Sequence, residues 1–416
     1  MWAMLRKVCR HYLPLLVLII AAASCLPSDA GLIEAPIGSL DNTLILYATK
    51  AEVETTPGHS STYYAFRTLP SLTYLDPTMF DTFYGESAQM ESIGMFLDEL
   101  HPQLSPNEQY LLIPGLASYP EYGVEGTGTW LLDLEAGEAR KLLPDGVIAT
   151  WNSTSDAIAY VADDTLYTLR IEENAKPTPL FQNSGLWPLY AKWSPDGRWV
   201  ATVTGVQRQI TEPDQADLIL TYWLIPVNAD PALELTVQED LAMEYSSAEM
   251  SWSPDGQFLL MRNEVFDLQG KLLSPDYSGR VRWLPDAPSL LADSGEGLRI
   301  LAIAGDEIAH ISATPASVWS FSRDGRRLAF DLPPTDDGIP LAIYDLESGE
   351  TQIAGSVPGA VRINSLRWSA DDGLLITEAE HGEARFDIWT LPAAANSTAE
   401  RLIENAVLID AVPYHR

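Results

Sequence analysis

The stretch that decides the fold is WSPDGRWVAT, at residues 193–202, and the same phrase returns as WSPDGQFLL at residues 252–260. Pro suits the second position of a type I turn, Asp hydrogen-bonds to nearby backbone, and Gly accepts the positive φ that closes a tight hairpin. The residues on either side of the turn are apolar and typical of strands. Each phrase therefore predicts an antiparallel hairpin.

Five looser copies of this phrase occur elsewhere in the chain. Two keep the Ser, Asp and Gly of the turn, and three are degenerate; in order of closeness they are residues 321–330 (FSRDGRRLAF), 368–376 (WSADDGLLI), 104–108 (LSPNE), 151–156 (WNSTSD) and 283–286 (WLPD). The first residue of each copy, here called the anchor residue, lies 31 to 59 residues from the next, with a mean of 44. A repeat of this period is typical of propellers and other repeat architectures.

A second hairpin signature follows the first in several units. Residues 130–138 (WLLDLEAGE) and 343–350 (IYDLESGE) both read as strand, Gly turn, strand, and residues 265–271 (VFDLQGK) are a shorter version. Two hairpins per unit make four antiparallel strands, which is one β-propeller blade. The residues that we predict to form structural turns are Pro195, Asp196, Gly197, Pro254, Asp255, Gly256, Asp324 and Gly325.

The repeat resembles that of TolB-type β-propellers, a WD-like repeat. The resemblance rests on W-S-P-D-G followed by apolar residues, then on an apolar strand that ends in Asp-Leu and a Gly turn, and it covers about residues 100–392. It implies an all-β fold of four-stranded antiparallel blades. Propellers of this type include periplasmic scaffold proteins and the non-catalytic propellers of prolyl oligopeptidase-type peptidases. The repeat therefore specifies the fold better than the function.

The two ends of the chain decide the number of blades. Residues 42–49 (NTLILYAT) read as a second strand without its own first strand, and residues 63–67 supply a third. The last blade is complete by about Ile403, yet residues 406–412 (AVLIDAV) offer one more apolar strand. Pairing this tail with the N-terminal strands would close the ring and remove its open edges, which favours eight blades. Seven blades is the alternative, if residues 30–100 form a decoration instead.

The first 30 residues resemble an export signal. Three basic residues precede an uncharged run at residues 12–26, which is shorter than the roughly 20 residues of a membrane-spanning helix. Small residues then lead into Cys25, as in the lipobox of bacterial lipoproteins. We expect lipidation of Cys25, with plain secretion and an uncleaved anchor as alternatives. The predicted organisation is a signal peptide at 1–24, a tether at 25–39 and a single propeller domain at 40–416 with an irregular insertion around 76–99.

Charge and cysteine content exclude several classes of protein. The 416 residues include 25 Lys and Arg against 58 Asp and Glu, a formal net charge of −33. A chain with this negative charge would repel the phosphate backbone of a nucleic acid. We therefore expect no nucleic-acid partner. Cys9 and Cys25 are the two cysteines, which excludes a disulfide framework and a Cys-based zinc cluster. The acidic surface predicts solubility and weak cation binding.

A search for catalytic motifs finds mostly absences. The nearest string to the G-x-S-x-G elbow of serine hydrolases is GESAQ at residues 85–89, which lacks the second Gly. Neither an HExxH motif nor a D-x-D-x-D-G calcium loop occurs. We therefore expect no catalytic residue, no metal site and no cofactor. The histidines outside the signal and the extreme C-terminus are scattered: His59, His101, His310 and His381.

Two features depart from the repeat. Trp187 precedes a predicted inner strand near a loop face, where an aromatic ring can stack on a sugar, so it is a candidate binding residue. Packing in the core is the alternative for this residue. The insertion around 76–99 combines apolar and acidic residues, which fits either a partner-binding lid or a first-blade connection packed on the ring.

The leading interpretation is a non-catalytic, membrane-anchored propeller in the bacterial cell envelope, on the extracytoplasmic side. Propellers present loops around a central axis, so recognition of a protein partner at one face, as a binding or scaffold module, is expected by analogy. One alternative is a carbohydrate-active propeller enzyme, a lyase or hydrolase, with His or carboxylate groups clustered where the loops converge. The other is a ligand sensor or accessory subunit of an envelope complex.

Overall fold

The computed structural model describes 31 strands, β1 to β31, and no helix among the residues that it places. Four predicted features lie outside these residues: Cys25, the signal-like segment, the tether and most of the insertion around 76–99, of which only Asp76 and β3 are described. The predictions made for them therefore stay predictions. The described residues are 40–56, 59–76, 82–84, 102–115, 128–144, 147, 149–184, 186–209, 216–228, 231–238, 250–261, 263–274, 277, 279–382 and 385–414.

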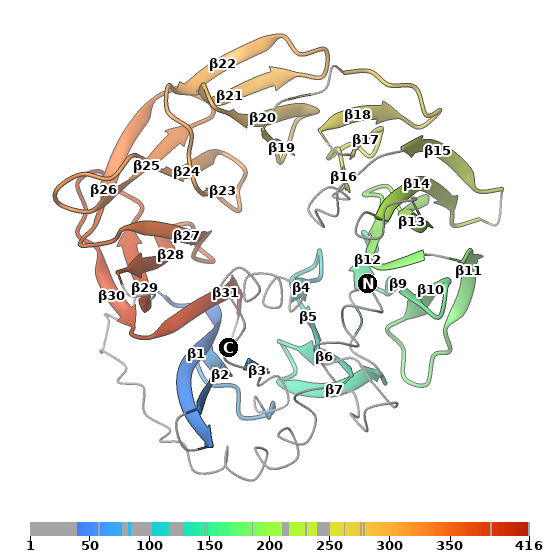
Figure 1. The fold of residues 1–416 in the computed structure, drawn as a ribbon, viewed down its shortest axis with the longest axis horizontal. Coiled ribbons are helices and arrows are strands. Elements are labelled where there is room, and N and C mark those ends of the chain that lie inside the picture. Colours follow the sequence, from blue (N-terminus) through green and yellow to red (C-terminus); the bar gives the residue numbers. More distant parts are fainter. Residues whose placement is uncertain are drawn as a thin grey trace.

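The strands form eight antiparallel sheets arranged in a ring, with the first strand of each sheet on the inside (Figure 1). This confirms the prediction of an all-β propeller with eight blades. Seven sheets have four strands. The sheet β16–β17–β18 has three, and a single bridge from Phe266 to Leu272 replaces the fourth.

The first half of the chain builds four blades. The closing blade, from the inside outward, is β31 (Ala406–Pro413), β1 (Thr43–Thr56), β2 (His59–Leu69) and β3 (Thr82–Tyr84). The next three are β4 (Gln103–Leu104), β5 (Tyr110–Pro114), β6 (Thr129–Asp133), β7 (Glu138–Leu143); β8 (Ala149–Trp151), β9 (Ala157–Ala162), β10 (Thr165–Arg170), β11 (Thr178–Gln182); and β12 (Leu186–Trp193), β13 (Trp199–Gln209), β14 (Ala216–Pro226), β15 (Leu233–Gln238).

The second half builds the other four blades. In order they are β16 (Met250–Trp252), β17 (Phe258–Met261), β18 (Glu264–Asp267); β19 (Arg280–Trp283), β20 (Ser289–Ser294), β21 (Gly297–Ala302), β22 (Glu307–Ser312); β23 (Trp319–Phe321), β24 (Arg327–Asp331), β25 (Ile339–Asp345), β26 (Thr351–Val357); and β27 (Arg362–Trp368), β28 (Leu374–His381), β29 (Arg385–Pro392), β30 (Glu400–Ile403). All seven predicted anchor residues end the first strand of a blade.

The burial of the strands follows their position in the blade. β9 (AIAYVA) and β25 (IPLAIYD) are buried along almost their whole length, because both faces of a blade pack against neighbouring blades. The outermost strands β7 and β22 alternate between partly buried and exposed residues. This is why the middle strands are continuous apolar runs in the sequence, whereas the outer strands are not.

The C-terminal strand closes the ring, as predicted. β31 pairs antiparallel with β1, from Thr43 opposite Pro413 to Thr49 opposite Ala406. Ile45 and Leu408 then pack with Ile376 and Ile388 of the last blade, all of them nearly inaccessible to solvent. β31 is therefore both the innermost strand of the closing blade and part of the apolar cover of the last blade.

We therefore predict that removal of residues 405–416 abolishes the single cooperative unfolding transition. Loss of one large buried side chain costs about 2–5 kcal/mol, and this deletion removes several, among them Leu408, Ile409 and Val412. Thermal unfolding followed by circular dichroism measures the effect, with removal of residues 415–416 alone as the control. A truncated chain with the same unfolding midpoint as the full chain would show that β31 is not needed for closure.

Candidate functional site

The turns between the first and second strands of the blades touch one another around one face of the ring. Asn107 N donates to Ser155 Oγ at 3.0 Å, and Arg323 N donates to Asp372 Oδ1 at 2.8 Å. A Cβ at Gly256 would lie 3.5 Å from the carboxyl carbon of Asp196. We call this surface the turn face; it is formed by residues 105–109, 152–156, 194–198, 253–257, 284–288, 322–326 and 369–373.

One hydrogen-bond network recurs in these turns. Ser194 Oγ donates to Asp196 Oδ1 at 2.6 Å and accepts from Trp199 N at 3.0 Å. The same serine and acid pair is present three more times, with the serines almost fully buried, and in a fifth copy Asn replaces Asp. The carboxylate also accepts from a backbone N–H two residues later, at 3.0 Å from Arg198. The pairs are Ser253–Asp255, Ser322–Asp324, Ser369–Asp371 and Ser105–Asn107.

These contacts stabilise the ionised form of the acids. The Ser322 hydroxyl and the backbone N–H of Arg326 hold the pKa of Asp324 below its usual range. For Asp196, burial acts to raise the pKa, but the hydrogen bonds from Ser194 and Arg198 outweigh it and the pKa is lowered. Carboxylates engaged in this way are acceptors within a turn, which accounts for their repetition without a bound ion.

The glycine of the turn occupies the one position that needs a positive φ. Gly197 and Gly325 have φ of 72° and 70°, in the left-handed region that only Gly adopts without strain. The degenerate copies place a non-Gly residue there, Glu108 and Ser155, both with φ of 61°. The degenerate phrases thus keep the backbone of the turn and lose its ideal residue.

Four of the anchor tryptophans bind their blade to the one before it. Four indoles donate to a backbone carbonyl on the innermost strand of the preceding blade, at 2.9 to 3.1 Å. The ring itself fills the space between the two sheets, as Trp151 does among Leu112, Leu131 and Ile158. These tryptophans are therefore interior parts of the fold. The four bonds are Trp151 to Gln103, Trp252 to Lys192, Trp283 to Ser251 and Trp368 to Ser320.

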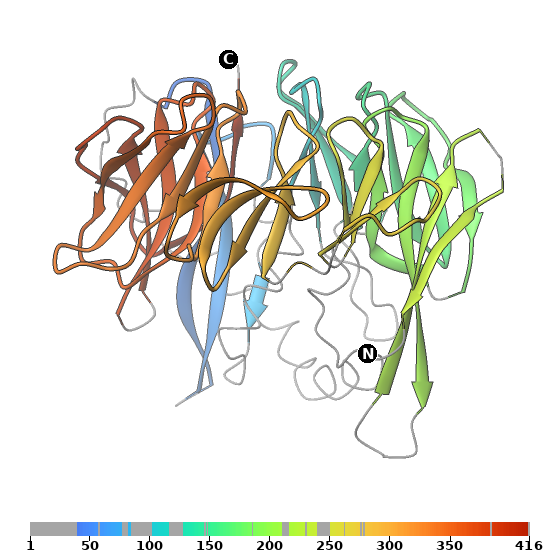
Figure 2. The same ribbon diagram turned by 90° about the horizontal axis from the view of Figure 1, so that it is seen from above.

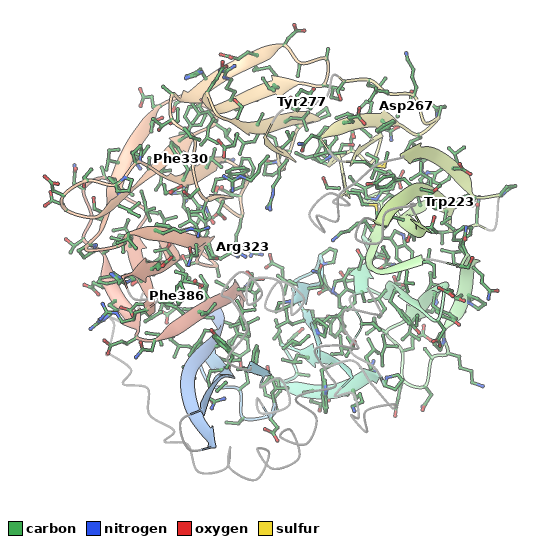
Figure 3. All side chains as sticks on the ribbon, in the orientation of Figure 1. Trp223, Asp267, Tyr277, Arg323, Phe330 and Phe386 are labelled. Carbon is green, nitrogen blue, oxygen red and sulfur yellow. The ribbon has the colours of Figure 1, made fainter. Side chains whose placement is uncertain are left out.

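An ion pair ties together turns that are 215 residues apart in the sequence. Arg323, after β23, donates to Glu108, after β4, and the last blade and the closing blade lie between their two blades. Figure 3 shows Arg323 at the inner rim of the ring. The pair bridges the turn face over the segment where the ring closes.

The described histidines do not assemble into a metal site, and no group of three metal-binding side chains occurs among the described residues. His381 is buried; its Nε2 accepts the indole N–H of Trp389 at 3.1 Å, so Nδ1 carries the proton and donates to Gly359 O at 3.1 Å. His310 is half exposed on the outer strand β22. The side chain of His59 and the whole of His101 lie outside the described residues.

Two buried acids of the last blade are structural. Glu378 accepts from Asn364 Nδ2 at 3.0 Å and from Leu408 N at 2.9 Å, and burial raises its pKa. It joins β28 to the closing strand β31. Asp387 is inaccessible to solvent and accepts from Asn405 N at 3.0 Å, beside the guanidinium of Arg401. Sequence reasoning missed both, because an acid inside an apolar strand carries no sign of its partners.

Trp187 is the second residue of β12, an inner strand, rather than a residue before it. Its side chain is outside the described part of the structure, so its binding role stays a prediction. No described helix is long and apolar enough to cross a membrane.

The face opposite the turn face carries two unusually long hairpins. β1 and β2 have 14 and 11 residues, and β13 and β14 have 11 each, whereas the second strands of the other six blades have between 4 and 8. Figure 2 shows both hairpins extending beyond the ring on the same side, away from the C-terminus. We call this the hairpin face.

Among the described residues, the far part of each hairpin has strand edges with no neighbouring strand. β1 pairs with β31 only as far as Thr49, but it continues with β2 to Thr56. β13 pairs with β12 up to Thr204 and β14 pairs with β15 from Leu220, so the four residue pairs from Val206–Ile219 to Gln209–Ala216 form a two-stranded ribbon. Neither β12 nor β15 covers the edges of this ribbon.

Comparisons with known proteins identify the architecture. No protein-family model matches the chain, and no curated protein matches it. Among solved structures, it is similar to a eukaryotic initiation factor, with a TM-score of 0.52 and 14% identity over 76% of this chain and 81% of that chain. An identity this low shows the fold alone.

Two bacterial structures are more distant in shape. TolB from Acinetobacter baumannii has a TM-score of 0.33 and 12% identity over 88% of this chain and 82% of that chain. The periplasmic gluconolactonase PpgL of Pseudomonas aeruginosa has a TM-score of 0.39 and 15% identity over 74% and 99%.

The turn network predicts an acid-dependent loss of stability. Asp324 has a lower pKa folded than its usual 3.8, so its contribution is present above that value and is lost as the pH falls through the folded pKa. Ser322→Ala removes the main cause of the lowered pKa and leaves a buried N–H of the turn without its acceptor, which costs about 1–3 kcal/mol at neutral pH. Urea unfolding from pH 7 to 2.5 measures both effects.

The difference in stability between wild type and Ser322→Ala should narrow below pH 3.8. Ser184→Ala, at an exposed turn, is the matched control and should follow the wild type throughout. A difference that stays constant across the pH range would mean that the serine does not act through Asp324.

Proposed function

We propose that this chain is a non-catalytic β-propeller that a lipid on Cys25 holds at the extracytoplasmic side of a bacterial membrane, where it binds a protein partner. The observation that carries the proposal is the pair of free-edged hairpins on the hairpin face. The signal-like segment and the residues before Cys25 support the location.

Free strand edges are a liability that proteins ordinarily cover, shorten or interrupt. Here β1 has seven residues beyond its pairing with β31, and the β13–β14 ribbon has four pairs beyond its neighbours among the described strands. Exposed N–H and C=O groups of such edges pair readily with an added strand of another protein, which gives affinity through the backbone. The hairpins therefore suit a partner that contributes an extended segment to this face.

The position of the hairpins fits a membrane-tethered binding module. They belong to the closing blade and to the blade β12–β15, which are separated by two blades on one side of the ring and by four on the other. A partner could contact both at once, and two linked contacts bind more tightly than either alone. No observation favours the carbohydrate-active enzyme or the sensor over this function.

The anchor is tested with the two cysteines of the chain. We expect the wild type and Cys9→Ser to sediment with membranes and to incorporate a fatty-acid label in a bacterial host. Cys25→Ser should do neither, because it removes the acyl-accepting thiol. If Cys25→Ser stays with the membrane but does not incorporate the label, the anchor is an uncleaved signal segment and not a lipid.

The interface is tested by shortening each hairpin. Replacing residues 206–219 with Asn-Gly joins Gly205 to Leu220 through a two-residue turn that suits a hairpin. We expect wild-type protein crosslinked in intact cells to retain a specific envelope protein, and the shortened variant to lose most of it. In a second variant, Asn-Gly replaces residues 52–62 of the β1–β2 hairpin and joins Ala51 to its strand partner Tyr63.

Both shortened variants should unfold at the temperature of the wild type, because the removed strand pairs lie beyond the ring. Replacement of residues 335–338, the turn between β24 and β25, with Asn-Gly is the control on an ordinary hairpin. Full retention of the partner by both shortened variants would overturn the proposed interface.

A further inference from the structure

The innermost strands carry a charge opposite to that of the whole chain. Across β4, β8, β12, β16, β19, β23, β27 and β31 there is one acid, Asp410. The same strands hold five of the basic residues of a chain in which acids outnumber bases by 58 to 25. These basic residues are Lys192, Arg280, Arg282, Arg362 and Arg367.

Three of these cations occupy one equivalent position in their blades. The residue before the anchor pairs with the fourth residue after the turn glycine or its equivalent, as Lys192 does with Ala201, Arg282 with Leu291 and Arg367 with Ile376. From the blade β8–β11 to the blade β27–β30, this position alternates between a hydroxyl and a cation. The six residues are Thr150, Lys192, Ser251, Arg282, Ser320 and Arg367. All six side chains are hydrogen-bond donors, and none is a carboxylate.

Three members of this set lie side by side. β12 contacts β16, and β16 contacts β19. The indole of Trp252 reaches the carbonyl of Lys192 at 3.0 Å, and that of Trp283 reaches the carbonyl of Ser251 at 3.1 Å. Neighbouring innermost strands therefore carry Lys192, Ser251 and Arg282. An anchor indole lies between each of these strands and the next.

Arg282 differs from Arg280 and Arg367, which have partners within the protein. Arg280 donates to Asp293 at 2.6 Å and to Ser317 O at 2.7 Å, and its guanidinium lies 4.0 Å from the centre of the Trp319 ring. Arg367 is paired with Asp410 at 2.9 Å. Arg282 is exposed, and within the described part of the chain it has neither a hydrogen bond nor an ion pair. Its five N–H donors are available to a ligand.

We propose that the inner wall of the ring at Ser251 and Arg282 binds a small ligand through an oxyanion, a carboxylate or a phosphate group. The guanidinium would hold two oxygens of the anion in a bidentate contact, with the Ser251 hydroxyl as a further donor. The acidic remainder of the protein opposes this only weakly at physiological salt, because screening limits interactions of exposed charges to about 8 Å. The site is independent of the partner proposed for the hairpin face.

Isothermal titration of the full-length chain with two probes tests this inference. Inorganic phosphate and citrate distinguish a phosphate site from a carboxylate site. We expect saturable binding of at least one probe at low ionic strength, with an affinity that falls as salt is added. Arg282→Gln should raise the Kd by about tenfold, because it removes the charge-assisted bidentate contact.

Two further variants control for the effect of substitution itself. Arg282→Lys keeps the charge without the bidentate fork and should bind with intermediate affinity. Arg140→Gln changes an exposed arginine on the outermost strand β7 and should leave the Kd unchanged. The inference is overturned if neither probe shows saturable binding, or if Arg282→Gln binds both probes as the wild type does.

Discussion

The architecture depends on a contact made at four of the seven anchor residues, in which an anchor indole donates its N–H to a carbonyl of the preceding blade. A blade alone would expose two apolar faces to water. The tryptophan covers part of one face and satisfies a backbone group at the inner edge, so it joins apolar packing to a directional bond. The buried serine network of the next turn holds the indole-bearing strand in place. Spacing of the blades thus follows from a short phrase in the sequence.

Ring closure adds constraints that the repeat does not carry. The first and last strands of the chain pair in one blade, and three polar contacts reinforce this segment: Thr43 Oγ1 accepts from Ala370 N at 2.9 Å, Glu378 holds Leu408 N, and Arg323 reaches Glu108. A buried glutamate costs free energy unless its oxygens are satisfied, and here two donors reach it. The polar groups of this segment fix the register at which the chain ends meet.

Three surfaces of the ring have different chemistry. The turn face is occupied by contacts among its own turns, with carboxylates engaged by hydroxyl and backbone donors. The hairpin face offers unpaired strand edges, and the inner wall offers cations and hydroxyls. The proposal for a protein partner is therefore placed on the hairpin face, and that for an anion on the inner wall.

The sequence alone determined the fold class, the first strand of seven blades and the strand that closes the eighth. The reason is that the hydrogen bonds of the turn phrase join residues at most six positions apart, and its Ser, Asp and Gly stabilise only the backbone of their own turn. It did not determine what the anchor indoles bond to, since Trp252 and Lys192 are 60 residues apart. Nor did it show that the hydroxyl and cationic residues before the anchors lie on the innermost strands of adjacent blades, or that Arg282 has no partner among the described residues. Those features exist only after separate blades bring equivalent positions together, so the tertiary structure decided them.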